Sequence, residues 1–128
     1  MRENGFSLIE VVVALTLLGL VILGFAATTA NLAQAADQSG DRLVAVELLQ
    51  GRLREITMDP DYDNLESRYE GDEKEIPGFP GYRRSTSIMR VTQTQANGRQ
   101  LDYQRVMVTV EGPGLRAPIS RTITIAAP

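Results

Sequence analysis

The sequence predicts an α+β fold in which one long N-terminal helix crosses a membrane with its first half and packs with its second half on a small antiparallel β-sheet. Three observations lead to this prediction. The first quarter of the 128-residue chain is apolar and almost free of charge. An apolar stripe of helical period follows it, and the last part of the chain alternates apolar and polar residues as strands do. A helix followed by a run of strands is typical of α+β proteins.

Residues 6–30 form the predicted transmembrane helix. Inserting fourteen large apolar side chains is favourable by about 4–8 kcal/mol, more than the roughly 3 kcal/mol that one carboxylate costs at the membrane centre. At about 1.5 Å per residue, the uncharged residues 11–30 cover about 30 Å, the thickness of the bilayer hydrocarbon. The fourteen are Phe6, Leu8, Ile9, Val11, Val12, Val13, Leu15, Leu17, Leu18, Leu20, Val21, Ile22, Leu23 and Phe25.

The charges that flank this helix predict its orientation. Arg2 precedes the apolar run, whereas Asp37 and Asp41 are the first charges after it. The positive-inside rule then places the N-terminus in the cytoplasm and the rest of the chain outside. A cleaved secretory signal stays open as an alternative, because Ala33-Gln34-Ala35 has the small-x-small form of a signal-peptidase site. The apolar run is longer than such signals usually have, and it contains an acid.

That acid, Glu10, is the first candidate functional residue. An ionisable group in a membrane segment needs a partner that offsets its desolvation. Between Arg2 and Arg42 there is no basic side chain. The partner must therefore be a chain end, another subunit or water at the membrane surface, and in the last case Glu10 simply extends its carboxylate to the interface.

The residues MRENG at positions 1–5, followed by FSLIE at positions 6–10, resemble the class III signal of the type IV filament family, which includes type IV pilins and type II secretion pseudopilins. The resemblance implies that residues 1–5 are a leader peptide whose last residue is Gly5. A prepilin peptidase would cut after Gly5 and methylate the new amine of Phe6. Glu10 would then pair with that amine on a neighbouring subunit during assembly. A free α-amine has a pKa near 8 and is therefore positively charged at neutral pH.

The same resemblance implies a pilin-like fold and a structural subunit of a type IV pilus or a type II secretion pseudopilus. Such a subunit waits as a single-pass protein of the bacterial inner membrane, with its C-terminal domain in the periplasm, and then joins a filament. The expected partners are other pilin or pseudopilin subunits, the prepilin peptidase and the inner-membrane assembly platform. Major pilins commonly carry a proline in the membrane stretch and a disulfide. This stretch has no Pro and the chain has no Cys, which favours a minor pilin or minor pseudopilin.

Residues 31–58 are predicted to continue the helix with a narrower apolar stripe. The stripe follows helical spacing and is expected to cover the sheet. Asp59-Pro60 then ends the helix. The stripe residues are Leu32, Leu43, Val46, Leu49, Leu53 and Ile56.

Residues 59–81 are predicted to be an acidic loop, because they are rich in Pro and Gly and hold eight acids before residue 76. Asp59, Asp61, Asp63 and Glu70 partly match the spacing of an EF-hand calcium loop. Asn64 stands where that template has Gly, and Pro60 restricts the backbone between the first two ligands. The simpler interpretation is a solvated surface loop, so we expect no metal and leave calcium open.

Residues 82–128 are predicted to form the antiparallel sheet. A strand over about Tyr82–Thr94 and the turn Asn97-Gly98 come first. Two further strands follow, separated by a turn at Gly112-Pro113-Gly114. Each of the two has apolar residues on one face. These are Val106, Val108 and Val110 in one strand and Ile119, Ile123 and Ile125 in the other.

Composition narrows the function further. The chain has no Cys and no His, which removes thiolate nucleophiles, imidazole bases and the usual zinc ligands, so we expect no enzyme and no cofactor. Residues 83–128 hold seven Arg against two acids, which keeps open a membrane-tethered or secreted ligand-binding module with a basic sheet face. We do not expect nucleic-acid binding, because the whole chain has a net charge of −3 and Tyr82 and Tyr103 are the only aromatic residues of the sheet region.

Overall fold

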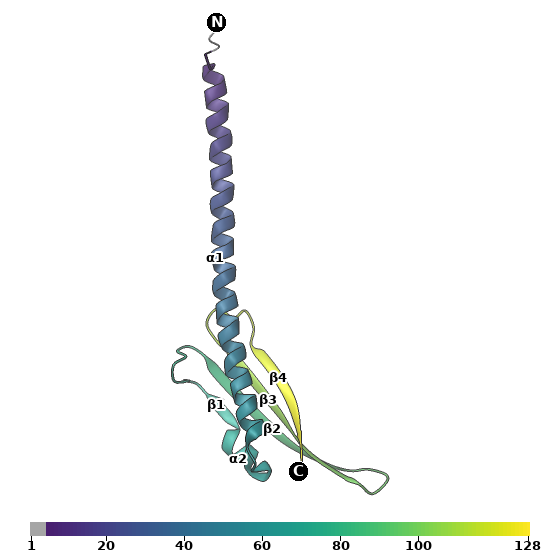
Figure 1. Ribbon diagram of the computed structural model, residues 1–128. Coiled ribbons are helices and arrows are strands. Elements are labelled where there is room, and N and C mark those ends of the chain that lie inside the picture. The colour runs from purple at the N-terminus through teal and green to yellow at the C-terminus, as the bar shows by residue number, and fades with distance from the viewer. Residues whose placement is uncertain (1–4) are drawn as a thin grey trace. The chain divides into compact units, whose positions relative to one another are not determined.

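The computed structural model describes residues 5–128 and confirms the α+β fold (Figure 1). The chain divides into two compact units, one up to Asp37 and the other from Gln38 to Pro128. Helix α1 contributes to both. The elements are α1 (Leu8–Met58), the 3-10 helix η1 (Tyr62–Asn64), α2 (Leu65–Tyr69), β1 (Gly71–Glu73), β2 (Arg83–Thr94), β3 (Gln100–Glu111) and β4 (Ile119–Ala126).

In the first unit, α1 is long and apolar enough to cross a membrane. Three threonine hydroxyls on this part of α1 donate hydrogen bonds to carbonyl oxygens one turn earlier. Thr16 reaches the carbonyl of Val12 at 2.8 Å, and Thr28 and Thr29 make the same bond at 3.0 Å. Since lipid offers no hydrogen-bond partners, this internal pairing lets the hydroxyls lie in an apolar segment at low cost.

The second unit is a four-stranded antiparallel sheet in the order β1-β2-β3-β4, with the C-terminal part of α1 across one of its faces (Figure 1). Ile88 of β2 and Ile123 of β4 are both register partners of Val106 in β3. The valines at 106, 108 and 110 are fully buried, as the alternation predicted. They form one hydrophobic core with the helix side chains of Ala45, Leu48, Leu49, Leu53 and Ile56.

The segment 59–81 is not the featureless loop that its composition predicts, because η1, α2 and β1 lie within it. Two side chains anchor it to the core: Tyr62 is 8% exposed and Leu65 only 1%. Strand β1 pairs with β2 through its backbone, with Gly71 opposite Thr86. The sheet therefore has four strands where the sequence indicated three. Backbone pairing requires no apolar alternation, and the residues Gly-Asp-Glu of β1 provide none.

The covered side of α1 also differs from the predicted stripe. Leu43 was expected to face the sheet but is 70% exposed, whereas Ala45 is fully buried and Leu48 is 6% exposed. The sheet contacts the side of the helix that carries the small Ala45 and the side chain of Arg52, which reaches Glu73 at 3.5 Å. Periodicity in large apolar residues located the stripe, but it could not show that a small residue and a charged one take part in the contact.

Two turns lie where glycine was expected to make them. Gly98 has φ +80°, and the N–H of Gln95 donates to the carbonyl of Arg99 at 2.8 Å, which closes the β2–β3 hairpin. The turn before β4 lies against its neighbours so closely that a Cβ on Gly112 would overlap the ring of Tyr82. A Cβ on Gly114 would overlap the carboxylate of Asp41.

Candidate functional site

The first turn of α1 is organised by Ser7. The N–H of Glu10 donates to the Ser7 side-chain oxygen at 3.3 Å and to the Ser7 carbonyl at 3.0 Å. Ser7 therefore caps the helix, which begins at Leu8. Our sequence reasoning did not single out Ser7, although Ser-x-x-Glu ahead of an apolar run is the signature of a capping box. The cap fixes Glu10 in the first helical turn.

The peptide bond between Gly5 and Phe6 lies just outside this helix. Both residues are exposed, and the side chain of Phe6 is 81% exposed. A Cβ on Gly5 would meet no atom within 4 Å, and Gly5 is not among the glycines with positive φ. The fold therefore does not require glycine at this position, and the bond is open to a peptidase. The rest of the predicted leader, residues 1–4, lies outside the described residues.

Glu10 itself is exposed, one turn into the helix. Within residues 5–128 its carboxylate makes no ion pair and no side-chain hydrogen bond. A carboxylate near a helix N-terminus gains about 0.3–1 kcal/mol from the helix dipole, well below the cost of placing a charge in lipid. The pairing with the amine of Phe6, which exists only after cleavage, stays a prediction.

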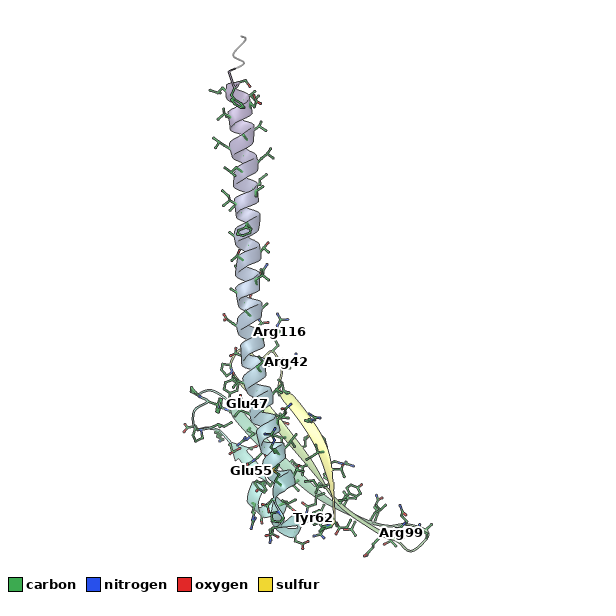
Figure 2. The ribbon with its side chains drawn as sticks, viewed as in Figure 1. Arg42, Glu47, Glu55, Tyr62, Arg99 and Arg116 are labelled. Carbon is green, nitrogen blue, oxygen red and sulfur yellow. The ribbon has the colours of Figure 1, made fainter. Side chains whose placement is uncertain are left out.

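The apolar surface of α1 behind Glu10 is open on every side (Figure 2). The large apolar side chains between Phe6 and Phe25 are 46–84% exposed. A helix that is apolar all round is stable only in lipid or among other apolar helices. This surface and the length of α1 fit a membrane anchor.

The four acids that partly match a calcium loop do not converge on a common point. Asp59 accepts hydrogen bonds from Arg68 at 2.9 Å and from the Tyr69 hydroxyl at 2.8 Å. Arg68 also pairs with Asp61 at 3.1 Å. Asp63 pairs with Arg90 of β2 at 2.9 Å. In the part of the chain that the structure describes, no group of three or more acids could hold a metal ion.

These bonds also set the acidity of Asp59. The N–H of Asp61 donates to its carboxylate at 2.9 Å, and this hydrogen bond, with those from Tyr69 and Arg68, holds the pKa of Asp59 below its usual value. Several acids of this segment therefore form ion pairs within the segment, with Arg68, or with Arg90 of β2.

Two of the seven arginines of the sheet region are likewise used inside the second unit. Arg84 donates to Glu73 at 3.0 Å and to the carbonyl of Leu48 at 3.2 Å. Arg90 pairs with Asp63 and donates to Asp102 at 3.0 Å. The hydrogen bond from Arg90, with a second from Tyr62, lowers the pKa of Asp102. The basic face inferred from sequence is thus partly neutralised.

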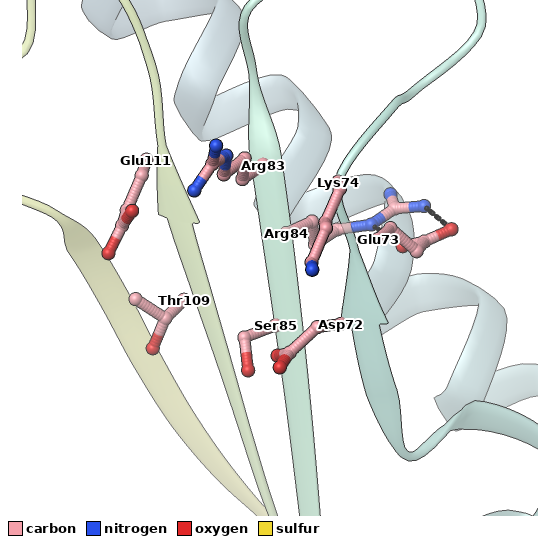
Figure 3. A pocket seen from close by; sticks show the side chains of 8 residues that line it. All are labelled: Asp72, Glu73, Lys74, Arg83, Arg84, Ser85, Thr109 and Glu111. Carbon is pink, nitrogen blue, oxygen red and sulfur yellow. Dashed lines mark hydrogen bonds and ion pairs between the residues drawn. The ribbon is translucent and has the colours of Figure 1, made fainter.

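A cavity of about 350 Å³ lies over β1, β2 and β3 (Figure 3). Its lining mixes both signs of charge, and Figure 3 shows Arg84 turned toward Glu73 and joined to it by hydrogen bonds. Small-molecule sites are lined mainly by hydrophobic and aromatic side chains, whereas every residue that lines this cavity is charged or carries a hydroxyl. It gives no support to a ligand-binding module. The lining residues are Asp72, Glu73, Lys74, Arg83, Arg84, Ser85, Thr109 and Glu111.

Comparison with known proteins bears on the N-terminal segment. Residues 1–26 match the family model described as the prokaryotic N-terminal methylation motif. Neither the curated proteins nor the solved structures searched gave a match to the chain. The match covers the residues that surround the Gly5–Phe6 bond and Glu10. The chain therefore carries a type IV prepilin signal at its N-terminus, which at this coarse level supports a processed, type IV pilin-like subunit.

Proposed function

We propose that the protein is a structural subunit of a type IV pilus or of a type II secretion pseudopilus. It waits in the bacterial inner membrane with its N-terminus in the cytoplasm and its sheet domain outside. A prepilin peptidase cuts it after Gly5 and methylates the amine of Phe6. An inner-membrane assembly platform then transfers it, with other pilin or pseudopilin subunits, into a filament built around its N-terminal helix.

One observation carries this proposal: the methylation-motif match over residues 1–26 falls on a segment with the geometry that such processing needs. The Gly5–Phe6 bond is exposed outside α1, and the cap at Ser7 begins the helix immediately afterwards. Cleavage there produces an amine two residues before Leu8, the first helical residue. The new positive charge and the carboxylate of Glu10 are then separated by one short turn of chain.

The pairing of these two charges is the proposed assembly step. Before cleavage, Glu10 has no cation within the described residues, and in lipid that isolation is costly. After cleavage, every subunit carries one cation and one anion near the same membrane surface. A carboxylate of one subunit and an amine of the next offset each other's desolvation, and in an apolar surrounding their attraction is strong. Pairing between subunits therefore favours the filament over the stored monomer.

We further infer a minor rather than a major subunit. The inference depends on the two departures from the major-pilin pattern, the absence of Pro from the membrane stretch and of Cys from the chain. A straight apolar helix without proline keeps all of its backbone hydrogen bonds. The partner subunits with which the protein is found in the cell distinguish a pilus subunit from a secretion pseudopilus subunit.

Mass spectrometry of the N-terminal peptide of the purified protein tests the processing step. We expect N-methylated Phe6 as the first residue. The matched variant Gly5→Leu is expected to fold as before, because the space around Gly5 is open, yet to keep residues 1–5 if the peptidase needs a small residue there. Mature protein that begins at Met1, or at Ala36 after signal-peptidase cleavage, would contradict the proposal. The second result would favour the secreted binding module instead.

A further inference from the structure

Strand β4 lies at one edge of the sheet, and half of its backbone groups point to the side where no strand follows it in the described part of the chain (Figure 1). In an antiparallel sheet, successive residues of a strand direct their N–H and C=O groups alternately to its two sides. The N–H of Ala127 donates to the carbonyl of Asp102, and the register of β3 with β4 is regular, so the odd-numbered residues of β4 pair with β3. The residues whose backbone groups point to the open side are Ser120, Thr122, Thr124 and Ala126.

The opposite edge, β1, offers much less backbone. The N–H of Gln95 donates to the carbonyl of Arg99, so β2 uses its odd-numbered residues for β3 and its even-numbered residues for β1. Of the three residues of β1, only Asp72 then directs its N–H and C=O outward. Short, charged edge strands are a common protection against strand pairing. Strand β4 lacks this protection, because it has eight residues and one charge.

The side of β4 that faces α1 is incompletely covered. Ile119, Ile123 and Ile125 pack against the hydrophobic core but are only half-buried. Beside Ile123 is a hollow of about 300 Å³, and Met58 of α1, which also lines it, is 76% exposed. A further strand next to β4 would cover these apolar side chains and pair the open backbone groups. The hollow is lined by Gln50, Leu53, Arg54, Thr57, Met58, Arg121 and Ile123.

Two arginines determine which side chain fits this hollow. Arg54 and Arg121 are exposed, and neither forms an ion pair within residues 5–128. Because the backbone of Arg121 pairs with β3, a residue opposite it on an added strand would belong to a non-hydrogen-bonded pair. The Cβ atoms of such a pair are about 4.5–5.5 Å apart. An acid at that position would meet Arg121, and an apolar residue two positions away would meet Ile123.

We propose that β4 binds an extended segment of a different protein as a fifth strand of the sheet. The segment has about eight residues, the length of β4. On the side toward α1 it carries apolar residues and one acid, which lies opposite Arg121. Its other side chains face away from α1, beside the hydroxyls of Ser120, Thr122 and Thr124, and are polar. The partner is thus recognised by backbone pairing, an alternating apolar pattern and one carboxylate.

A second copy of this chain fits the edge poorly. Antiparallel pairing of two β4 strands relates the copies by a two-fold axis normal to the sheet. Since α1 lies across a face of the sheet, this axis makes the two α1 helices run in opposite directions (Figure 1). Under the proposed function both helices start in the same membrane, which excludes that arrangement. This step alone rests on the proposed function; the rest of the inference goes beyond it.

A synthetic peptide tests the fifth strand in the full-length protein in detergent. The probe Thr-Val-Thr-Val-Thr-Glu-Thr-Val, aligned antiparallel to β4, places its glutamate opposite Arg121 and a valine opposite Ile123. Hydrogen–deuterium exchange of the protein should slow at the amides of Ser120, Thr122, Thr124 and Ala126. Fluorescence anisotropy of the labelled peptide measures its affinity.

Two methylated peptides separate backbone pairing from contact of side chains alone. N-methylation of the threonines blocks the N–H groups that face β4, and it should weaken binding more than about tenfold because several hydrogen bonds are lost. N-methylation of the valines removes donors on the far side of the peptide and should weaken it much less. Equal binding of the two methylated peptides would overturn the proposal, as would no binding of the unmodified probe at millimolar concentration.

Charge exchange tests the role of Arg121. Replacing the glutamate of the probe with lysine should weaken binding about two- to fivefold or more, the effect of an exposed ion pair. The variant Arg121→Glu should reverse this preference and bind the lysine peptide better than the glutamate peptide. If Arg121 instead protects the edge from pairing, Arg121→Glu would leave the order of the two peptides unchanged, and the proposed charge recognition would be wrong.

Analytical ultracentrifugation distinguishes the remaining occupant. Dimers of the protein that the probe peptide dissociates would assign the edge to a second copy and would overturn the proposal. The peptide assay is independent of cleavage at Gly5. Protein that starts at methylated Phe6 but binds no peptide refutes the fifth strand and leaves the filament role standing. Protein that keeps Met1 and binds the peptide refutes the filament role alone.

Discussion

Single side chains fasten the segment between α1 and β2. The carboxylate of Asp59 accepts hydrogen bonds from the N–H of Asp61, from Tyr69 and from Arg68. On β3, the side-chain amide of the buried Gln104 donates to the carbonyl of Tyr62 at 2.6 Å. These bonds replace the apolar alternation that the segment lacks, which is why its three short elements form in a sequence with the composition of a loop.

The lowered pKa values of Asp59, Glu73 and Asp102 predict loss of stability in acid. A carboxyl whose pKa is lower in the folded than in the unfolded state stabilises the fold above the unfolded pKa of about 4, and this contribution is lost as the pH falls through the folded value. The thermal unfolding temperature of the full-length protein in detergent, followed by tyrosine fluorescence, should therefore fall steadily below about pH 4. All four tyrosines lie between Tyr62 and Tyr103, so the signal reports only on the second unit.

Asp102→Asn should make this decline shallower, because it removes one of the carboxyls with a lowered pKa. The matched control is Glu66→Gln, which removes an exposed acid without an ion pair in the described residues and should leave the profile unchanged. Identical acid profiles for the wild-type protein and Asp102→Asn would show that the bonds from Arg90 and Tyr62 do not contribute.

The turn before β4 provides a second prediction for a single residue. Gly112→Ala should destabilise the second unit by about 1–3 kcal/mol, as overpacking does, because the new Cβ would overlap the ring of Tyr82. The contrasting variant is Gly51→Ala in the C-terminal part of α1, where a Cβ meets nothing within 4 Å. That change should stabilise the helix by up to about 1 kcal/mol. Equal effects of the two substitutions on thermal unfolding would contradict the packing of this turn.

At the scale of elements, the regular pieces could be predicted and the irregular ones could not. Strands β3 and β4 are recognisable from their alternation of apolar and polar residues, and Asn97-Gly98 marks the hairpin between β2 and β3. Strand β1 is recognisable only from its pairing with β2, because a strand of Gly-Asp-Glu has no apolar face. The same holds for α2, a helix of five residues that depends on burial of Leu65 rather than on helical periodicity.

The side of α1 that covers the sheet is directly testable. Leu48→Ala should cost about 2–5 kcal/mol, because the side chain is 6% exposed and its removal leaves a cavity. Leu43→Ala removes the same atoms five residues earlier, yet it should change the free energy of unfolding by less than about 0.5 kcal/mol, because Leu43 is 70% exposed. Urea unfolding of the two variants in detergent measures the difference. A larger loss of stability for Leu43→Ala than for Leu48→Ala would contradict this packing and would support the helix face that the sequence indicated.

At the scale of the whole molecule, the two units have separate roles. The first unit exposes its apolar side chains and carries the proposed processing site, and the second unit buries its own core of α1 and sheet residues. Sequence could identify the candidate site because its signal is local, a short motif ahead of an apolar run. It could not identify which acids and arginines pair inside the second unit, because residues such as Asp63 and Arg90 are far apart in sequence and only the fold brings them together.

The central claim is that Glu10 obtains its cation only from a cleaved neighbouring subunit. The most direct test compares the fraction of Phe6-initiated protein that sediments with filaments for the wild type, Glu10→Asp and Glu10→Gln. Glu10→Gln keeps the size of the side chain and should be processed normally, yet enter filaments about tenfold less or worse, as expected when one partner of a buried ion pair is lost. Glu10→Asp should retain part of the incorporation. Normal incorporation of processed Glu10→Gln would contradict the claim.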